Sequence, residues 1–181
     1  MLLKVNNDLF IELMGPEHKY ELFHIIDTNR EHLGKWLLWV NKRQAADDLD
    51  PVFPVWLKNF EDSNGFDAGI RYQGRLVGMI SLHYIDWKNK STSIGYFLSK
   101  EAEGRGIITK TISSLLTHIF EELGLNRAEI RVASGNTRSR AIPERLGFIQ
   151  EGITRDGQWL HDHFEDLINY SMLGRDWVQK K

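Results

Sequence analysis

The 181-residue sequence contains no cysteine and four prolines, and its longest apolar run, Trp36 to Val40, is short. Without cysteine the chain forms no disulfide, offers no thiolate to a metal and has no cysteine nucleophile. The run is too short to cross a bilayer, and residues 1–13 lack the basic start and long apolar stretch of a signal peptide. These absences favour a cytoplasmic protein with no membrane partner.

The balance of charge excludes a second class of partner. The chain carries 23 lysines and arginines against 25 aspartates and glutamates, which gives a formal net charge of −2 at pH 7. Domains that bind nucleic acid directly carry a basic footprint, so we expect no nucleic-acid partner. The hydrophobic share of 41% and the charged share of 27% are ordinary for a globular protein. The length suits one domain over residues 1–181.

Hydrophobic periodicity in the N-terminal half changes from helical spacing to strict alternation. Leu22, Ile25 and Ile26 lie on one side of a helix, whereas Phe66 and Ala68 begin the alternation of a half-buried strand. Because short turns join the three strands that follow, they form an antiparallel meander. The predicted segments are a strand at 10–14, a helix at 18–33, a loop at 41–53, a helix at 54–60, and strands at 66–72, 76–85 and 94–98.

The C-terminal half contains the longest predicted helix. Ile108, Ile112 and Leu115 are spaced as on an amphipathic helix that packs on a sheet, and Gly124 ends it. After it the sequence predicts a strand at 127–133, a helix at 136–146 and strands at 148–160 and 164–173. The order is β-α-α-β-β-β-α-β-α-β-β. We therefore expect a single α/β domain of the α+β type, with a mixed, mostly antiparallel sheet flanked by helices.

A glycine-containing turn, Glu101 to Gly106, lies between the meander and the longest helix. Its glycines allow a tight turn and a close approach to a ligand. The following helix presents unpaired N–H groups and a positive dipole end, which together suit a pyrophosphate. Arg105 adds a charge-assisted contact. The turn lacks the Lys-Ser or Lys-Thr of a P-loop and the third glycine of a dinucleotide-binding fold.

A set of motifs in fixed order resembles the GNAT superfamily of acetyltransferases, and within it the RimJ/RimL group. The motifs are Ile94-Gly95-Tyr96-Phe97-Leu98, Gly104-Arg105-Gly106, Thr109, Glu121-Glu122-Leu123-Gly124-Leu125, Asn136, Ser139, Glu144-Arg145-Leu146-Gly147-Phe148, Glu151-Gly152, Arg155, Asp166 and Tyr170-Ser171. The resemblance implies acetyl-CoA as cosubstrate, no metal, and transfer of the acetyl group to a primary amine. The RimJ/RimL group acetylates protein N-termini, notably those of ribosomal proteins.

The resemblance also implies which residues bind the cofactor. The pyrophosphate motif falls on Glu101, Gly104 and Gly106, where Glu101 departs from the usual glutamine or arginine. An acidic side chain repels a pyrophosphate, so we expect Glu101 to point away and backbone N–H groups to bind. The strand before the turn is expected to splay from its neighbour, and Asn136 to bond the pantetheine arm. The expected cofactor-binding residues are Phe97, Leu98, Ser99, Glu103, Gly104, Arg105, Gly106, Ile107, Ile108 and Asn136.

Ser139 matches a serine that the group is proposed to use to protonate the departing thiolate. A hydroxyl near a developing thiolate stabilises its charge, and a solvent-facing helix serine is the alternative. Pro143, four residues later, cannot donate a hydrogen bond to the Ser139 carbonyl. We therefore expect a local kink at Ser139.

The sequence leaves the general base open. Many members of the superfamily carry a glutamate in the strand before Ile-Gly-Tyr, where this chain has Ser93. Because an α-amino group has a reference pKa of about 7.7–8.0 against about 10.4 for lysine, the missing carboxylate fits an α-amine acceptor. The remaining candidates are His83, Glu151 and Asp156, of which imidazole exchanges protons most readily near neutral pH.

Three other groups have both a functional and a structural interpretation. Trp36 and Trp39 lie three residues apart, as on one helix face, and either line the acceptor cleft or bury a packing surface. The acidic stretch at 47–50, with Glu61 and Asp62, either attracts a cationic acceptor or is solvated. The two histidines of 161–163 need not converge on a metal.

Three functions remain open at this point. The first is acetylation of a protein α-amine, for example on a ribosomal protein. The second is acetylation of a small amine such as a polyamine or an antibiotic, and the third is a non-catalytic acyl-CoA sensor. The final strands are candidates for a homo-oligomer contact, as sheet edges often are.

Overall fold

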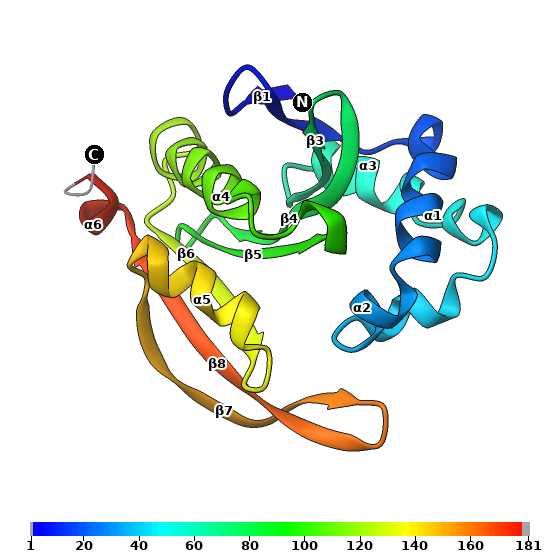
Figure 1. Ribbon diagram of the computed structural model, residues 1–181. Helices are drawn as coiled ribbons and strands as arrows, with labels where there is room; N and C mark the ends of the chain where they lie inside the picture. The colour runs from blue at the N-terminus through cyan, green and yellow to red at the C-terminus, as the bar shows by residue number, and fades with distance from the viewer. Residues whose placement is uncertain (1, 179–181) are drawn as a thin grey trace.

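The computed structural model describes residues 2–178 and shows one mixed sheet with helices on both faces (Figure 1). The strands are β1 (Leu2–Lys4), β2 (Leu9–Leu13), β3 (Phe66–Tyr72), β4 (Arg75–Asp86), β5 (Ser91–Leu98), β6 (Arg127–Ala133), β7 (Ile149–Leu160) and β8 (His163–Leu173). The helices are α1 (Lys19–Thr28), α2 (Arg30–Gly34), α3 (Phe53–Glu61), α4 (Ile107–Thr117), α5 (Thr137–Leu146) and α6 (Gly174–Val178). Short 3₁₀ turns are η1 (Pro16–His18), η2 (Leu38–Lys42), η3 (Ala46–Leu49) and η4 (Lys100–Ala102), and a π-turn, η5 (His118–Glu122), extends α4.

The eight strands lie in the order β1-β2-β3-β4-β5-β6-β8-β7. All neighbouring strands are antiparallel except β5 and β6, which run parallel. The predicted meander is present as β3, β4 and β5, and the predicted helices before and after β6 are present as α4 and α5. The mixed, mostly antiparallel sheet expected from the sequence is confirmed.

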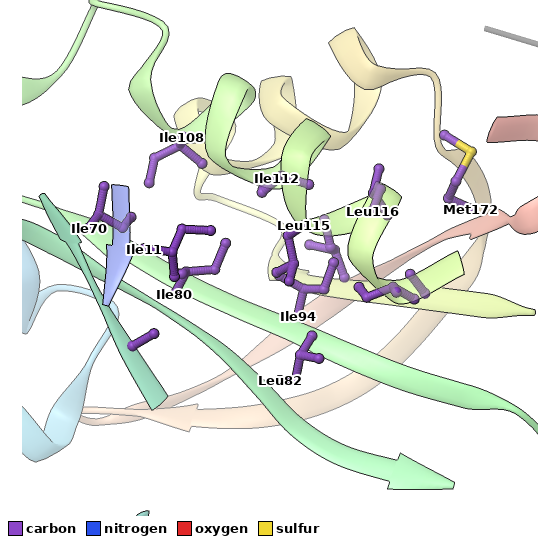
Figure 2. Close-up of a cluster of buried hydrophobic side chains, with 14 of the residues drawn as sticks. Ile11, Ile70, Ile80, Leu82, Ile94, Ile108, Ile112, Leu115, Leu116 and Met172 are labelled. Carbon is purple, nitrogen blue, oxygen red and sulfur yellow. The ribbon is translucent and has the colours of Figure 1, made fainter. Parts of the chain in front are cut away.

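Alternation along the central strands divides the apolar residues between two cores. Ile80 and Ile94 point to the face covered by α4, where they lie in one cluster with Ile112 and Leu115 (Figure 2). Met79, next to Ile80, points to the other face and packs with the buried residues of α1, α2 and α3. The sheet therefore separates an α4–α5 side from an α1–α3 side.

The first predicted helix, 18–33, is interrupted at Asn29. Its backbone leaves helical geometry (φ −120°, ψ 19°), and its side-chain amide donates to the carbonyl of Ile25 at 3.0 Å. The Asn29 amide oxygen accepts from the backbone N–H of Lys100 at 2.9 Å. One buried asparagine thus divides α1 from α2 and fixes both to the segment before α4.

Two further expectations differ from the structure. The predicted loop at 41–53 begins inside the helical turn η2 and contains η3, at whose start the carboxylate of Asp48 accepts hydrogen bonds from the backbone of Gln44 at 2.7 Å and of Ala45 at 2.9 Å. The sequence did not predict β1 or α6, because segments of three and five residues are too short to show a period.

The pairing of β5 with β6 is brief. Three residue pairs join them, Ser91–Ser93 on β5 with Arg127–Glu129 on β6, while β5 stays paired with β4 as far as Leu98. The two parallel strands therefore splay apart beyond Ser93, as expected. The splay leaves an opening at the middle of the sheet that connects the α4–α5 side with the α1–α3 side.

Candidate active site

A cavity of about 1410 Å³ occupies the splay and reaches both sides of the sheet. One part, here called the glycine wall, is formed by Gly104, Gly106, Ile107 and Ile108, and the lining also includes Asn136 and Ser139. The opposite part, here called the aromatic wall, is formed by Trp36, Trp39, Trp56 and Phe97. Ligand sites are usually about 300–1,000 Å³, so the cavity has room for two ligands that meet at the splay.

The glycine wall is the N-terminal end of α4. Gly104 (φ +75°) and Gly106 (φ +69°) both adopt left-handed backbone conformations, and a Cβ atom on either would meet nothing within 4 Å. Gly106 is the N-cap residue and provides no side-chain cap. The first N–H groups of α4 therefore point into the cavity without a capping side chain, and with the helix dipole they form an anion site.

Three basic side chains line the cavity beside this anion site. They are Lys110, one turn into α4, and Arg138 and Arg145 on α5. Arg145 donates to the Thr109 hydroxyl at 3.3 Å. The sequence analysis missed these residues, although the spacing of 138 and 145, two helical turns, places both on one face of α5. They supply positive charge suited to a polyphosphate.

The residues expected on the cofactor side divide into two groups. Phe97, Leu98, Glu103, Gly104, Gly106, Ile107, Ile108 and Asn136 line the cavity. Ser99 and Arg105 do not: the Ser99 side chain is buried, and Arg105 is exposed outside the lining. Glu101 is exposed and also outside the lining, whereas the carboxylate of Glu103 pairs with His32 at 3.1 Å and with Arg138.

Asn136 caps α5 and lines the cavity. Its amide oxygen accepts from the backbone N–H of Ser139 at 3.2 Å, and its non-helical backbone (φ −84°, ψ 68°) begins the helix. The cap occupies the oxygen, so the amide N–H groups are the donors that Asn136 can offer to a ligand.

The Ser139 carbonyl receives no helical hydrogen bond from Pro143 and accepts one from Tyr96 instead. The Tyr96 hydroxyl donates to the Ser139 carbonyl at 3.1 Å, and the Ser139 hydroxyl in turn donates to the Tyr96 oxygen at 3.1 Å. Burial raises the pKa of Tyr96 well above its ordinary value, so this hydroxyl remains a neutral donor. Pro143 lies inside an unbroken α5. Two hydrogen bonds to Tyr96 therefore attach Ser139 to β5, and the kink expected at Ser139 stays a prediction.

Of the three candidate bases, His83 alone lines the cavity. A Cβ atom on Gly95 would lie 2.1 Å from His83 Nε2, so the imidazole crosses β5 just beyond the splay. Glu151 lies at a bulge of β7 and accepts hydrogen bonds from Arg127 and Ser171, which lower its pKa to about 2. Asp156 is exposed on β7 outside the cavity lining.

The aromatic wall does not rest on one helix. Trp36 follows the end of α2 and Trp39 lies in η2, so the expected common helix face is wrong. Both indoles nevertheless line the cavity. The Trp39 ring lies 6.0 Å from that of Phe97 at an interplanar angle of 57°, and the Trp36 carbonyl accepts from the Gln158 amide at 3.3 Å.

The acidic stretch is engaged within the chain. Asp47 and Asp50 both contact the Lys19 ammonium, at 2.8 and 2.9 Å, so two carboxylates expected to attract a cationic acceptor already have a partner. At the β7–β8 turn, His163 pairs with Asp162 at 3.0 Å. Within residues 2–178, no group of three or more His, Cys, Asp or Glu side chains is arranged to hold a metal ion.

Comparison with known proteins agrees with this geometry. Residues 8–149 match the family model described as Acetyltransferase (GNAT) domain. The chain is 44% identical, over 98% of both chains, to the "Putative ribosomal N-acetyltransferase YdaF" of Bacillus subtilis. It is 26% identical to the "Ribosomal-protein-serine acetyltransferase" of Escherichia coli, over 94% of this chain and 96% of that protein. The structure of the microcin C7 self-immunity acetyltransferase MccE, in complex with acetyl-CoA and AMP, superposes with a TM-score of 0.89 at 25% identity and 94% coverage of both chains.

The chain belongs to the GNAT family of acetyltransferases. It is an acetyl-CoA-dependent N-acetyltransferase whose relatives include enzymes named for ribosomal proteins. The cavity fits this cosubstrate, because an uncapped helix N-terminus and three basic side chains face one end of it and the splayed strand β5 forms its side. None of the helices in the described chain has the length and apolar character needed to cross a membrane.

Proposed function

We propose that this enzyme acetylates the α-amine of a protein N-terminus. The observation that carries the proposal is the composition of the opening between the two walls. The family's usual glutamate position is Ser93, and His83 is the one of the three candidate bases that reaches the cavity. A lysine amine, with a reference pKa of about 10.4, needs strong help to lose its proton, while an α-amine of about 7.7–8.0 does not.

Different residues of this chain bind the two parts of the cosubstrate, its diphosphate and its pantetheine arm. The N–H groups that begin α4, with Lys110, Arg138 and Arg145, hold the diphosphate of the cosubstrate. The edge of β5 beyond Ser93, at Phe97 and Leu98, offers backbone groups to the pantetheine arm.

Bound acetyl-CoA supplies an activated acyl group. His83 takes a proton from the incoming amine. Ser139 donates a hydrogen bond and then its proton to the departing sulfur, and it regains a proton through solvent from the nitrogen as the amide forms. Orientation by the two walls supplies most of the rate.

The relatives support a protein acceptor, and the acidic stretch does not support a small polycation. The names of the Bacillus and Escherichia relatives refer to ribosomal proteins, in the second case to a serine. Because Asp47 and Asp50 already pair with Lys19, two charges of the stretch that was expected to attract a cationic acceptor of either kind are already paired. Acetylation of a small amine is the competing outcome of the test below.

The test is acetyl transfer to matched acceptors, with the product read by mass spectrometry. The acceptors are hexapeptides that begin with serine or alanine and contain one internal lysine, the same peptides with a blocked N-terminus, and spermidine. We expect acetylation of the free N-terminus and none at the internal lysine of the blocked peptides. Preferential acetylation of spermidine, or of the internal lysine, would overturn the proposal.

A further inference from the structure

A polar row crosses the sheet on the α1–α3 side. In the antiparallel register Asp67 on β3 is opposite Ser81 on β4, and Ser81 is opposite Gly95 on β5. Residues directly opposite in antiparallel strands share a face, and the next row on this face ends at Phe97 of the aromatic wall. Asp67 and Ser81 both line the cavity. The row thus places a carboxylate and a hydroxyl beside the splay.

The carboxylate of Asp67 is held but not neutralised. The Ser81 hydroxyl donates to it at 2.6 Å. No lysine, arginine or histidine nitrogen in the described part of the chain lies within 4.0 Å of it, in contrast to Asp47, Asp50 and Glu103. Burial raises the pKa of Asp67 above its ordinary value, while Ser81 and the nearby His83 oppose that shift. A carboxylate that is partly withdrawn from water gains stability from a cationic partner, so the site suits a bound cation.

The surroundings define the kind of cation. Trp36, Trp39, Trp56 and Phe97 line the same cavity, and aromatic faces attract organic ammonium groups. Within the described residues Asp67 belongs to no group of three or more His, Cys, Asp or Glu side chains that could hold a metal ion, and one carboxylate suits one ammonium group better than a divalent metal. His83, which crosses Gly95, lies between Asp67 and the splay on the same face.

We propose that Asp67, oriented by Ser81, binds the acceptor amine in its protonated form, and that His83 then accepts one ammonium proton. The neutral amine left behind forms the N–C bond as the C–S bond of the thioester breaks. The departing sulfur gains a proton from Ser139, and the second proton that the nitrogen loses as the amide forms returns through solvent to Ser139. This inference rests on the proposed function, acetylation of a protein α-amine, and places the acceptor on the side of the aromatic wall. It adds a recognition group that neither the sequence motifs nor the relatives identify.

Binding to the CoA-saturated protein tests the inference without turnover. The probes are a lysine-free hexapeptide that begins with serine and its N-acetylated form, measured by calorimetry at pH 6.5, where the free α-amine is protonated. We expect Asp67→Asn to raise the Kd of the free-amine peptide by about tenfold or more, equivalent to about 1.4 kcal/mol. The Kd of the acetylated peptide and that of CoA should not change. The matched control Asp62→Asn removes an exposed carboxylate that pairs with Lys58 on α3, and we expect no change in any of the three constants.

Two more variants separate binding from proton transfer. Ser81→Ala keeps the Asp67 carboxylate but removes the hydroxyl that orients it, so the Kd of the free-amine peptide should rise by less than in Asp67→Asn. Gly95→Ala displaces the His83 imidazole, so kcat should fall while the Kd of the free-amine peptide stays the same.

The outcomes distinguish this inference from the proposed function. Equal binding of the free-amine peptide by wild type and Asp67→Asn would overturn the ammonium site even if N-terminal acetylation is found. If only spermidine or butylamine binds, and Asp67→Asn weakens that binding, the ammonium site stands and the protein N-terminus is the wrong acceptor. Loss of binding for both the free and the acetylated peptide would mean that Asp67 acts on the structure of the cleft, which would also overturn the inference.

Discussion

The glycine wall and the aromatic wall of the cavity are built by different means. The glycine wall binds through its backbone: two glycines with positive φ and the uncapped start of α4. The aromatic wall consists of side chains drawn from four separate places in the chain: the turn after α2, η2, α3 and β5.

A site made of backbone groups suits the cosubstrate, which is the same in every reaction of the enzyme. Any sequence that preserves the turn before α4 also preserves the N–H groups that bind it. A side-chain site can be changed one residue at a time, and this suits the partner that differs between enzymes. The contrast predicts that substitutions at the glycine wall change cofactor affinity, and that substitutions at the opening between the walls change turnover or acceptor choice.

The largest expected effect is on the glycine wall. Gly104→Asp places a carboxylate at the anion site, and we expect it to raise the Kd of CoA by about 100-fold, about 2.7 kcal/mol. Gly124→Asp is the matched control, because Gly124 also has positive φ (+65°), with nothing within 4 Å of an added Cβ atom. Both variants should lose similar stability through backbone strain, about 1–2 kcal/mol, but only Gly104→Asp should lose affinity in calorimetry. Equal affinity in the two folded variants would remove the anion site from the binding mechanism.

A smaller effect is expected where the two walls meet. Ser139→Ala should lower kcat by roughly 10- to 100-fold, as expected when one transition-state donor is removed, with little change in the Kd of CoA. Thr137→Ala, which removes an exposed hydroxyl of the same helix from outside the cavity lining, should leave both constants unchanged. Steady-state kinetics with calorimetry separates the two, and a Ser139→Ala variant with wild-type kcat would exclude this serine as the acid.

The attachment of Ser139 to β5 predicts a coupling between two residues that the sequence places far apart. Tyr96→Phe leaves the Ser139 carbonyl without its donor, which should cost about 1–3 kcal/mol of unfolding free energy. In a Pro143→Ala background the helix regains its own N–H donor, so the same Tyr96→Phe change should cost less. A double-mutant cycle from urea unfolding measures this coupling, and strictly additive values would show that Tyr96 does not substitute for the missing helix donor.

The smallest effect is expected outside both walls. Glu151→Gln should leave kcat unchanged and remove less than about 1 kcal/mol of stability, because its pair with Arg127 is exposed. The folded pKa of about 2 lies below the ordinary value of 4.5, so this stability is present above pH 4.5 and lost as the pH falls towards 2. The two proteins should therefore differ in urea unfolding at pH 7 and converge near pH 2. A clear fall in kcat would return Glu151 to the list of bases.

The difference between the walls also explains what the sequence could predict. Gly104 and Gly106 lie in one short turn before an amphipathic helix, so local sequence is enough to predict an anion site, and the prediction placed most of its residues on the cavity. Arg105 and Ser99, also predicted to bind the cofactor, lie outside the cavity lining, because composition does not show which way a side chain points from a tight turn.

The opening between the walls depends on register, which local sequence does not determine. Asp67 and Ser81 meet only because β3 and β4 pair with that alignment, which continues past a bulge at Ile70. Tyr96 was read as part of a motif, but its contact with Ser139 joins residues that are 43 positions apart. The effect of Pro143 was predicted correctly as a missing donor, and only the tertiary structure showed what replaces it.

The first five strands of the sheet are joined to the last three through three residue pairs between β5 and β6, which form a narrow seam. A bound CoA that lies along the splayed edge of β5 and reaches α5 would act as a brace across that seam. Binding at 100 times Kd would add about 2.7 kcal/mol to the stability of the folded state, and it would oppose separation of the two parts of the sheet. In cells the supply of acetyl-CoA would then govern the lifetime of this enzyme as well as its rate.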